Sequence, residues 1–192
     1  KKGKDHERKI VHEKYPDVVS ISYETPELGF RSTIESMILG NETLHSMPMY
    51  YLPKGVYGIP DMLEKSNTEN SIFGEYHYTV TEVKLAKNIK QEHLIQGAFY
   101  NYLLGAIQGI TPDVFCTING DGQKEEHDYR SYEPTLMSLI GDTRKILQGE
   151  SISPTYNSCK YPWKNYCNKK AVEVKDISLV DGLGQSKKSK LY

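Results

Sequence analysis

The stretch that most constrains the fold runs from residue 75 to residue 108. Its first part, EYHYTVTEVKLA, alternates apolar and polar residues, which predicts a β-strand. Because successive side chains of a strand point to opposite faces, Glu82 and Lys84 are expected to project side by side on one face. Residues 91–108 follow directly with a broad apolar face at helical spacing, which predicts a long helix.

The other patterns predict helices and strands in alternation. Helices are expected at 4–15, 31–39 and 133–147, and strands at 18–24, 47–52, 56–64, 114–120 and 127–132, with hairpin turns at 53–55 and 120–122. Pro60 cannot donate to a strand ladder, so an edge or bulge is expected just before Asp61. This order predicts an α/β or α+β fold with a central mixed sheet flanked by helices.

Length and charge set further bounds. A chain of 192 residues is expected to form one main domain, and its first residue, Lys1, suggests a piece of a longer protein. It holds no apolar run as long as a membrane span and no secretory signal, which predicts a cytoplasmic protein. The residues from Lys160 onward include 8 Lys and 3 acidic residues, which gives a net charge of +5. Since the whole chain has a net charge of −1, the residues before Lys160 carry −6. This asymmetry fits an acidic metal site beside a phosphate-attracting segment, although scattered solvated lysines would produce it equally well.

Two carboxylates and one ammonium are expected to meet on the sheet. A strand that carries Asp61 could bring its carboxylate to Glu82 and Lys84, and such a group suits a divalent ion and a phosphodiester. A Glu-x-Lys pair alone is common and is usually an exposed ion pair.

Two further features raise the significance of this group. Gln96 and Tyr100 lie four residues apart, so they share one face of the helix that follows the Glu-x-Lys strand. His6 lies on the first predicted helix, from where it could descend onto the sheet. Taken singly, Tyr100 could be a core residue, and Gln96 and His6 could be solvent-exposed.

In this order, G-x-x-H, GIPD, EVK and Q-x-x-x-Y form a pattern that resembles the RecB-like nuclease branch of the PD-(D/E)xK superfamily. The CRISPR-associated RecB-like exonucleases and the predicted helicase-fused RecB-family nucleases are the most similar. The resemblance spans His6 to Leu191 and implies a restriction-endonuclease-like core. It also implies roles for single residues: His6, Asp61 and Glu82 as metal ligands with the carbonyl of Val83 as a fourth, Lys84 as the catalytic lysine, and Gln96 and Tyr100 as the helix motif that touches DNA or orients the lysine.

The chemistry of these residue types fits phosphodiester hydrolysis. Mg²⁺ or Mn²⁺ on carboxylate oxygens can activate water and relieve charge in the transition state, and an imidazole ligand favours Mn²⁺. Lys84 could position or deprotonate the water, or neutralise a phosphate oxygen, and the sequence does not decide between these roles. Glu7 and Glu64 are secondary metal-site candidates.

The cysteines carry a second implication of the resemblance. Many members of the branch hold an iron–sulfur cluster with four cysteines, and the segment C-K-Y-P-W-K-N-Y-C supplies Cys159 and Cys167 as two cluster ligands. Tyr161 stands where the middle cysteine is expected, so the ligand set is incomplete. Cys116, in an apolar strand, is expected to be a buried core thiol. An odd number of cysteines also makes a disulfide framework unexpected.

The C-terminal stretch ISLVDGLGQSKKSKL resembles the first half of a helix-hairpin-helix, a DNA-phosphate-binding motif. The predicted organisation is therefore a nuclease domain at 1–150 and, at 151–192, a cysteine-containing loop with a partial helix-hairpin-helix. The predicted function is a metal-dependent deoxyribonuclease, an exonuclease on single-stranded or frayed DNA ends, with helicase or CRISPR-adaptation partners or a role in DNA repair. The alternatives are a catalytically idle DNA-binding or assembly module that keeps the fold, and a purely structural interaction domain.

Overall fold

The structure is a computed structural model that describes residues 2–20, 22–150, 154–160, 162–188 and 190. The chain divides into two compact units, Lys1–Leu139 and Ile140–Tyr192. The boundary between these units falls within helix α4 (Glu133–Leu147).

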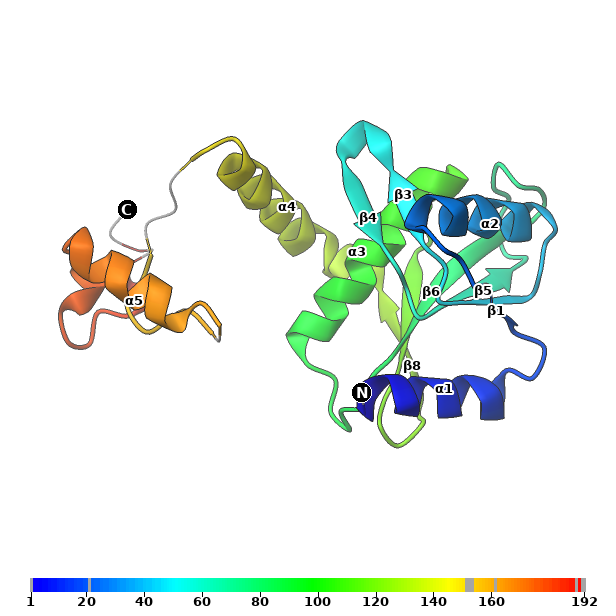
Figure 1. Cartoon of the computed structure of the whole chain (residues 1–192), viewed down its shortest axis with the longest axis horizontal. Helices are drawn as coiled ribbons and strands as arrows, with labels where there is room; N and C mark the ends of the chain where they lie inside the picture. Colours follow the sequence, from blue (N-terminus) through cyan, green and yellow to red (C-terminus); the bar gives the residue numbers. More distant parts are fainter. Residues whose placement is uncertain (1, 21, 151–153, 161, 189, 191–192) are drawn as a thin grey trace. The chain divides into compact units, whose positions relative to one another are not determined.

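A mixed β-sheet forms the centre of the first unit, as predicted (Figure 1). In the described part of the chain it has six strands in the order β1-β2-β5-β6-β7-β8. The pairs β1/β2 and β6/β7 are parallel, and the other three neighbouring pairs are antiparallel. The strands are β1 (Val19–Ser20), β2 (Thr43–His45), β5 (Met62–Ser66), β6 (His77–Val83), β7 (Val114–Ile118) and β8 (Lys124–Asp128).

The segment predicted as one strand at 56–64 is divided between two sheets. Its first part belongs to a separate hairpin, and its last part belongs to the main sheet. Strands β3 (Met49–Tyr51) and β4 (Val56–Gly58) pair antiparallel around the 3₁₀ turn η1 (Leu52–Lys54). The chain leaves the hairpin at Pro60, which cannot donate to a ladder, and enters the main sheet at Met62. The break expected at Pro60 therefore places Asp61 between β4 and β5.

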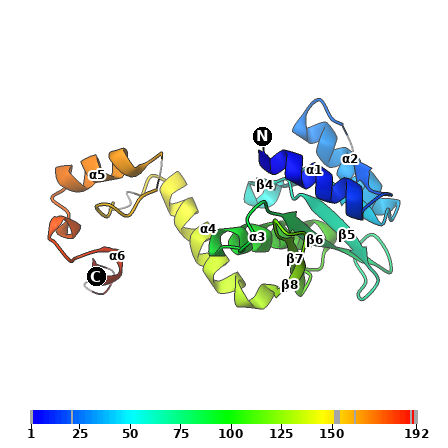
Figure 2. The same ribbon diagram turned by 90° about the horizontal axis from the view of Figure 1, so that it is seen from below.

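Two helices cover opposite faces of the sheet. Helix α1 (Lys2–Lys14) buries Ile10 and Val11 against a cluster that includes Ile118 of β7. On the same strand, Phe115 points to the other face, where its ring packs against Gly97 of helix α3 (Gln91–Gln108), so closely that an added Cβ would lie 2.6 Å from the ring. Figures 1 and 2 show α1 and α3 on the two sides of the strands.

Several predicted boundaries differ from the observed ones. Helix α2 spans Pro26–Ile38 instead of 31–39, because Thr25 caps its N-terminus through a 3.4 Å hydrogen bond from the Leu28 N–H, and Pro26 occupies the first turn. Of the predicted 18–24 strand, the described residues form only β1, and Ile21 lies outside them; strand β2 was not predicted. The strand predicted at 127–132 is β8 at 124–128, because the Asp128 carboxylate caps the 3₁₀ turn η2 (Tyr129–Ser131) that follows it.

The second unit is more regular than the predicted loop. Helix α5 (Lys164–Glu173) occupies part of the segment that was predicted to be loop-like, so that prediction is wrong there. Cys159 and Cys167 form a disulfide across the start of α5, with their Cα atoms 6.3 Å apart, which the odd cysteine count did not lead us to expect. Disulfide sulfurs carry no thiolate, so in this state the two residues are not cluster ligands; an iron–sulfur cluster stays an untested prediction. Cys116 is buried in β7, as predicted.

The end of the second unit contains a 3₁₀ turn, η3 (Ile177–Leu179), a bend with Gly182 at φ +76°, and a short helix, α6 (Gln185–Lys188). The first helix expected for a helix-hairpin-helix is only this 3₁₀ turn, and the last residues of the predicted motif lie outside the described ones. Lys188 Nζ lies 2.5 Å from an Asp176 carboxylate oxygen, which ties α6 to the start of η3.

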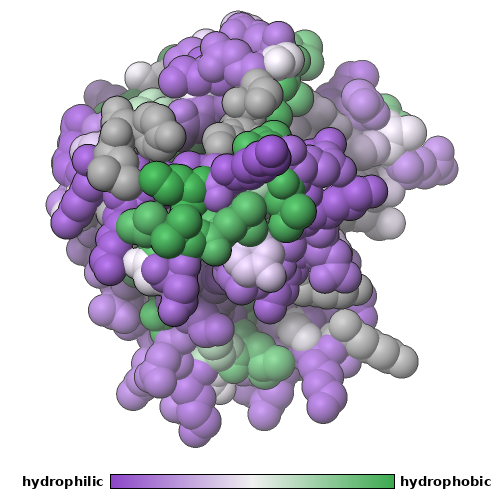
Figure 3. All heavy atoms as spheres, turned by 90° about the vertical axis from the view of Figure 1, so that its left-hand side faces the viewer, coloured by the Kyte–Doolittle hydropathy of each residue, from purple (hydrophilic) through white to green (hydrophobic). Residues whose placement is uncertain are grey.

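Exposed apolar side chains also occur on the second unit. Figure 3 shows hydrophobic side chains gathered among hydrophilic ones on the face it draws. Large apolar residues that are at least 40% exposed in this unit include Leu179 at 40%, Val172 at 56%, Val174 and Val180 at 57% and Trp163 at 66%.

No helix in the described part of the chain combines the length and apolar character needed to cross a membrane.

Candidate functional site

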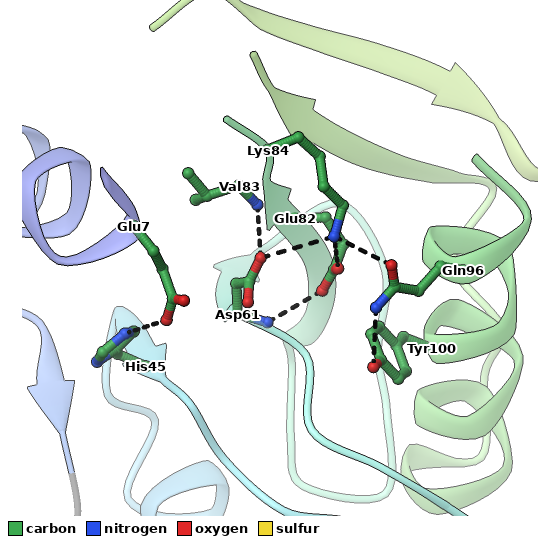
Figure 4. A network of polar contacts seen from close by, with 8 residues as sticks. All are labelled: Glu7, His45, Asp61, Glu82, Val83, Lys84, Gln96 and Tyr100. Atoms are coloured by element: carbon green, nitrogen blue, oxygen red, sulfur yellow. Dashed lines mark hydrogen bonds and ion pairs between the residues drawn. The ribbon is translucent and has the colours of Figure 1, made fainter. Parts of the chain in front are cut away.

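The site forms where strand β5 begins beside the end of strand β6. These strands are antiparallel with Met62 opposite Thr81, so Asp61 arrives next to Glu82. The contact is reciprocal: the Glu82 Oε1 atom accepts the Asp61 backbone N–H at 3.0 Å, and the Asp61 Oδ2 atom accepts the Val83 N–H at 2.7 Å. Figure 4 shows these two carboxylates turned toward each other between the strands. The strand register and these two backbone-to-carboxylate hydrogen bonds therefore hold the two acids side by side.

Lys84 completes this group, on the strand face predicted from alternation. Its Nζ atom lies 2.6 Å from Glu82 Oε2 and 4.0 Å from Asp61 Oδ2. The Glu82 side chain is 1% exposed and the Lys84 side chain 14% exposed, so water screens this ion pair weakly. The ammonium therefore lies between two acids at the C-terminal end of the interior strand β6.

Helix α3 supplies the outer part of the site. Lys84 Nζ donates to Gln96 Oε1 at 3.1 Å, and Gln96 Nε2 donates to the Tyr100 hydroxyl at 3.1 Å. Tyr100 is fixed in turn by hairpin strand β4, since a Cβ added to Gly58 would lie 2.5 Å from its ring. The structure therefore brings together five of the predicted site residues in one network: Asp61, Glu82, Lys84, Gln96 and Tyr100 (Figure 4).

Burial and mutual repulsion change the acidity of this group. Desolvation raises the pKa of Glu82, and the neighbouring Asp61 charge raises it further, against the lowering effect of Lys84. Desolvation likewise raises the pKa of Asp61; Lys84 opposes this shift, and the Glu7 carboxylate adds to it. Desolvation lowers the pKa of Lys84, but attraction to Glu82 and Asp61 outweighs it, so the net pKa is raised and the ammonium keeps its proton. Two carboxylates with raised pKa values favour additional positive charge.

His6 does not join this network. Its Nε2 atom is buried and has no hydrogen-bond partner among the described residues. The side chain lines a separate pocket of about 280 Å³ together with Lys14 of α1 and Gly122 of the β7–β8 turn. The structure thus places the predicted histidine ligand on the side of α1 that faces this turn, away from the Asp61 cleft.

The next residue, Glu7, occupies the place expected for His6. Glu7 and His45 both line a cleft of about 540 Å³ that also contains Asp61. The Glu7 Oε1 atom lies 3.0 Å from His45 Nε2, and Ser20 Oγ lies 2.9 Å from His45 Nδ1 (Figure 4 shows the Glu7–His45 pair). Neighbouring strands create this arrangement, because Ser20 and His45 are partners in the parallel β1/β2 register.

The sequence analysis ranked Glu7 as secondary and did not consider His45. Glu7 follows His6 directly, so an error of one helical position is enough to exchange them, and a helix rotates by about 100° per residue. No strand was predicted at 43–45, so His45 gave no signal. The other secondary candidate, Glu64, lies on the opposite sheet face, where it accepts hydrogen bonds from Thr81 and, at 2.7 and 2.8 Å, from Lys124.

The oxygen donors of the site suit a hard divalent cation, but they are not arranged as a complete ligand cage. Among the described residues, no three His, Cys, Asp or Glu side chains lie close enough together to hold a metal ion. Asp61 and Glu82 supply two neighbouring carboxylates, and Glu7 is a third acid that faces the same cleft. Val83 contributes its backbone N–H to Asp61.

The comparisons with known proteins add no relative. No protein-family model matches the chain, and a search of curated proteins found no significant match.

Proposed function

We propose that the chain is a divalent-metal-dependent deoxyribonuclease that hydrolyses DNA phosphodiesters, with exonuclease action on single-stranded ends. The observation that carries this proposal is the group of Asp61, Glu82 and Lys84, in which the ammonium lies 2.6 Å from the buried Glu82 carboxylate and 4.0 Å from the partly buried Asp61 carboxylate. The mixed sheet with α1 and α3 on its faces is compatible with a restriction-endonuclease-like core. In that fold, an Asp and a Glu-x-Lys at the junction of two strands would form the catalytic centre.

The donor chemistry of the site fits Mg²⁺ or Mn²⁺. Asp61 and Glu82 would hold the ion: burial first, and then repulsion from neighbouring acids, raises their pKa values, and a bound dication would favour both carboxylates in the charged form. When bound, the ion supplies charge relief at the phosphate and a more acidic water. Glu7, at the opposite wall of the cleft, is the acid that would complete the ligand set.

Lys84 would act as a charged donor. Since its pKa is raised, its ammonium keeps the proton and can donate to a non-bridging phosphate oxygen as negative charge grows there. Gln96 holds the ammonium from the helix side, and Tyr100 fixes the Gln96 amide. Of the roles open to Lys84, charge neutralisation therefore fits better than deprotonation of water.

A cleavage assay with matched variants tests the proposal. Purified protein is incubated with end-labelled single-stranded DNA and Mn²⁺, beside Glu82→Gln, Lys84→Met and the control Lys87→Met. Lys87 lies in the loop between β6 and α3, and its side chain is 76% exposed and pairs with Asp121, outside the network. We expect Lys84→Met to lower the cleavage rate by about 10²–10³-fold, the usual effect of removing one donor to transition-state charge, and Lys87→Met to leave it unchanged. Equal cleavage by all four proteins would refute the proposal.

A second candidate function is a DNA-binding or assembly module without turnover. One observation favours it: the described residues contain no preassembled three-ligand metal group, and Lys84 already neutralises part of the charge of both acids. DNA binding that persists in the variants, with no Mn²⁺-dependent cleavage by the wild-type protein, would support this candidate over the nuclease.

A further inference from the structure

The cleft beside Asp61 extends well beyond the acids. It measures about 540 Å³, within the range of about 300–1,000 Å³ typical of small-ligand sites. Its wall away from Lys84 is made by helix α1, strand β1 and the residues Ser22 and Tyr23. Apart from Glu7 of α1, the residues of this wall have no role in the chemistry proposed above, yet they line the same cleft as Asp61.

Two cations stand at this wall. Lys4 and Arg8 both line the cleft, and their spacing of four residues places them on one face of α1. Both side chains are exposed, and neither has a carboxylate partner within the described part of the chain. The cations and the hydroxyls of Ser22 and Ser46, which also line the cleft, are typical ligands of a nucleic-acid backbone.

An aromatic ring completes the wall. Tyr23 lines the cleft and is half-buried, and its ring rests on Gly29 of α2, where an added Cβ would lie 2.7 Å from the ring. Pro48 approaches the same position of Gly29 equally closely, so the ring is confined between α2 and the start of the β3 hairpin. A ring held in place before binding loses little conformational entropy when a base stacks on it.

We infer that this cleft is a nucleotide subsite for an unpaired DNA residue adjacent to the cleaved bond. In this arrangement the base stacks on Tyr23, and Arg8 and Lys4 bind the neighbouring backbone phosphate. The substrate class in this inference rests on the proposed function, to which the subsite adds a preference. A base that stacks on a protein ring is not paired, so the subsite selects single-stranded or frayed DNA.

Binding in the absence of metal separates this inference from catalysis. The probe is a fluorescein-labelled pentathymidylate, and its affinity is measured by fluorescence anisotropy in EDTA for the wild type, Tyr23→Leu, Tyr23→Phe and Arg8→Gln. We expect Tyr23→Leu to weaken binding by about 5- to 150-fold, the range for one stacked base, and Tyr23→Phe to bind like the wild type. Tyr166→Leu is the control, since Tyr166 is 59% exposed on α5 and does not line the cleft.

A second probe makes the test independent of how the variants fold. A pentamer of abasic residues keeps the phosphates and removes every base, so the wild type should bind it more weakly than pentathymidylate, whereas Tyr23→Leu should bind the two probes equally. Arg8→Gln should weaken both probes alike and reduce the dependence of binding on salt. Equal wild-type affinity for the two probes, or unchanged pentathymidylate binding by Tyr23→Leu, would overturn the subsite. Because no cleavage enters these measurements, a failed nuclease assay with intact Tyr23-dependent binding would refute the nuclease and leave the subsite standing.

Discussion

Replacing Lys84 by Met removes the positive charge between the buried Glu82 and the partly buried Asp61 and keeps most of the side-chain volume. In the wild type, burial raises the pKa of Asp61 to about 6 and that of Glu82 to about 7, so between about pH 4 and about pH 7 the folded protein holds more protons than the unfolded chain. Their ionisation therefore lowers stability as the pH rises. Lys84 opposes both shifts, so its loss must raise both pKa values further and steepen this decline.

The size of the effect follows from the burial of the pair. Removing one partner of a buried ion pair typically costs about 3–5 kcal/mol, because the remaining charge is left uncompensated. The Glu82 side chain is 1% exposed, so we expect a loss of this order at pH 8, equivalent to a fall of about 6–20 °C in Tm for a chain of this size. At pH 4.5 the acids are largely protonated in the folded variant, and the difference should shrink to below about 1 kcal/mol.

Thermal unfolding followed by circular dichroism at both pH values measures this difference. Lys87→Met, the exposed-lysine control, should stay within about 1 kcal/mol of the wild type throughout. A loss of Tm in Lys84→Met that is the same at pH 4.5 and pH 8 would show that packing, and not charge, is responsible. An unchanged Tm at pH 8 would refute the electrostatic account of the site.

Three further variants test separate parts of the site. Gly58→Ala should displace the Tyr100 ring, cost about 1–3 kcal/mol through overpacking and lower the cleavage rate, as measured by thermal unfolding and DNA cleavage; unchanged activity would separate Tyr100 from the site. Glu64→Gln, on the opposite face of the sheet, should leave cleavage at the wild-type rate, and a large loss of cleavage would show that the catalytic acids are wrongly identified. Glu7→Ala should weaken Mn²⁺ binding in calorimetry by about 10–100-fold, whereas His6→Ala should not; the reverse result would restore His6 as a ligand.

Local patterns predicted the central strand and the helix behind it. The alternation in β6 correctly placed Glu82 and Lys84 on one face, and the four-residue spacing in α3 correctly placed Gln96 and Tyr100 together. Both inferences depend only on the repeat of a single element, which sequence alone carries. The sequence also indicated that a strand carrying Asp61 could approach Glu82, but it placed Asp61 inside one strand at 56–64, whereas the chain changes sheets there and Asp61 directly precedes β5.

Several features of the site depend on long-range packing or on short elements, and local sequence patterns did not predict them. Which residue of α1 faces the cleft depends on how Ile10 and Val11 pack against the sheet, and this contact turns Glu7 rather than His6 toward Asp61. His45 lies on a strand of three residues, too short to leave a periodic signal. Helix α5 was missed because its apolar face is weak and its sequence, KNYCNKKAVE, is mostly polar.

The most direct test of the account is a crystal structure of the protein soaked in Mn²⁺, with anomalous diffraction data collected to locate the ion. The account predicts a single strong anomalous peak in contact with carboxylate oxygens of both Asp61 and Glu82, with the Lys84 ammonium displaced from between them. The absence of a peak there at saturating Mn²⁺, or a peak bound only at other residues, would contradict the assignment of these acids as the metal site of a nuclease.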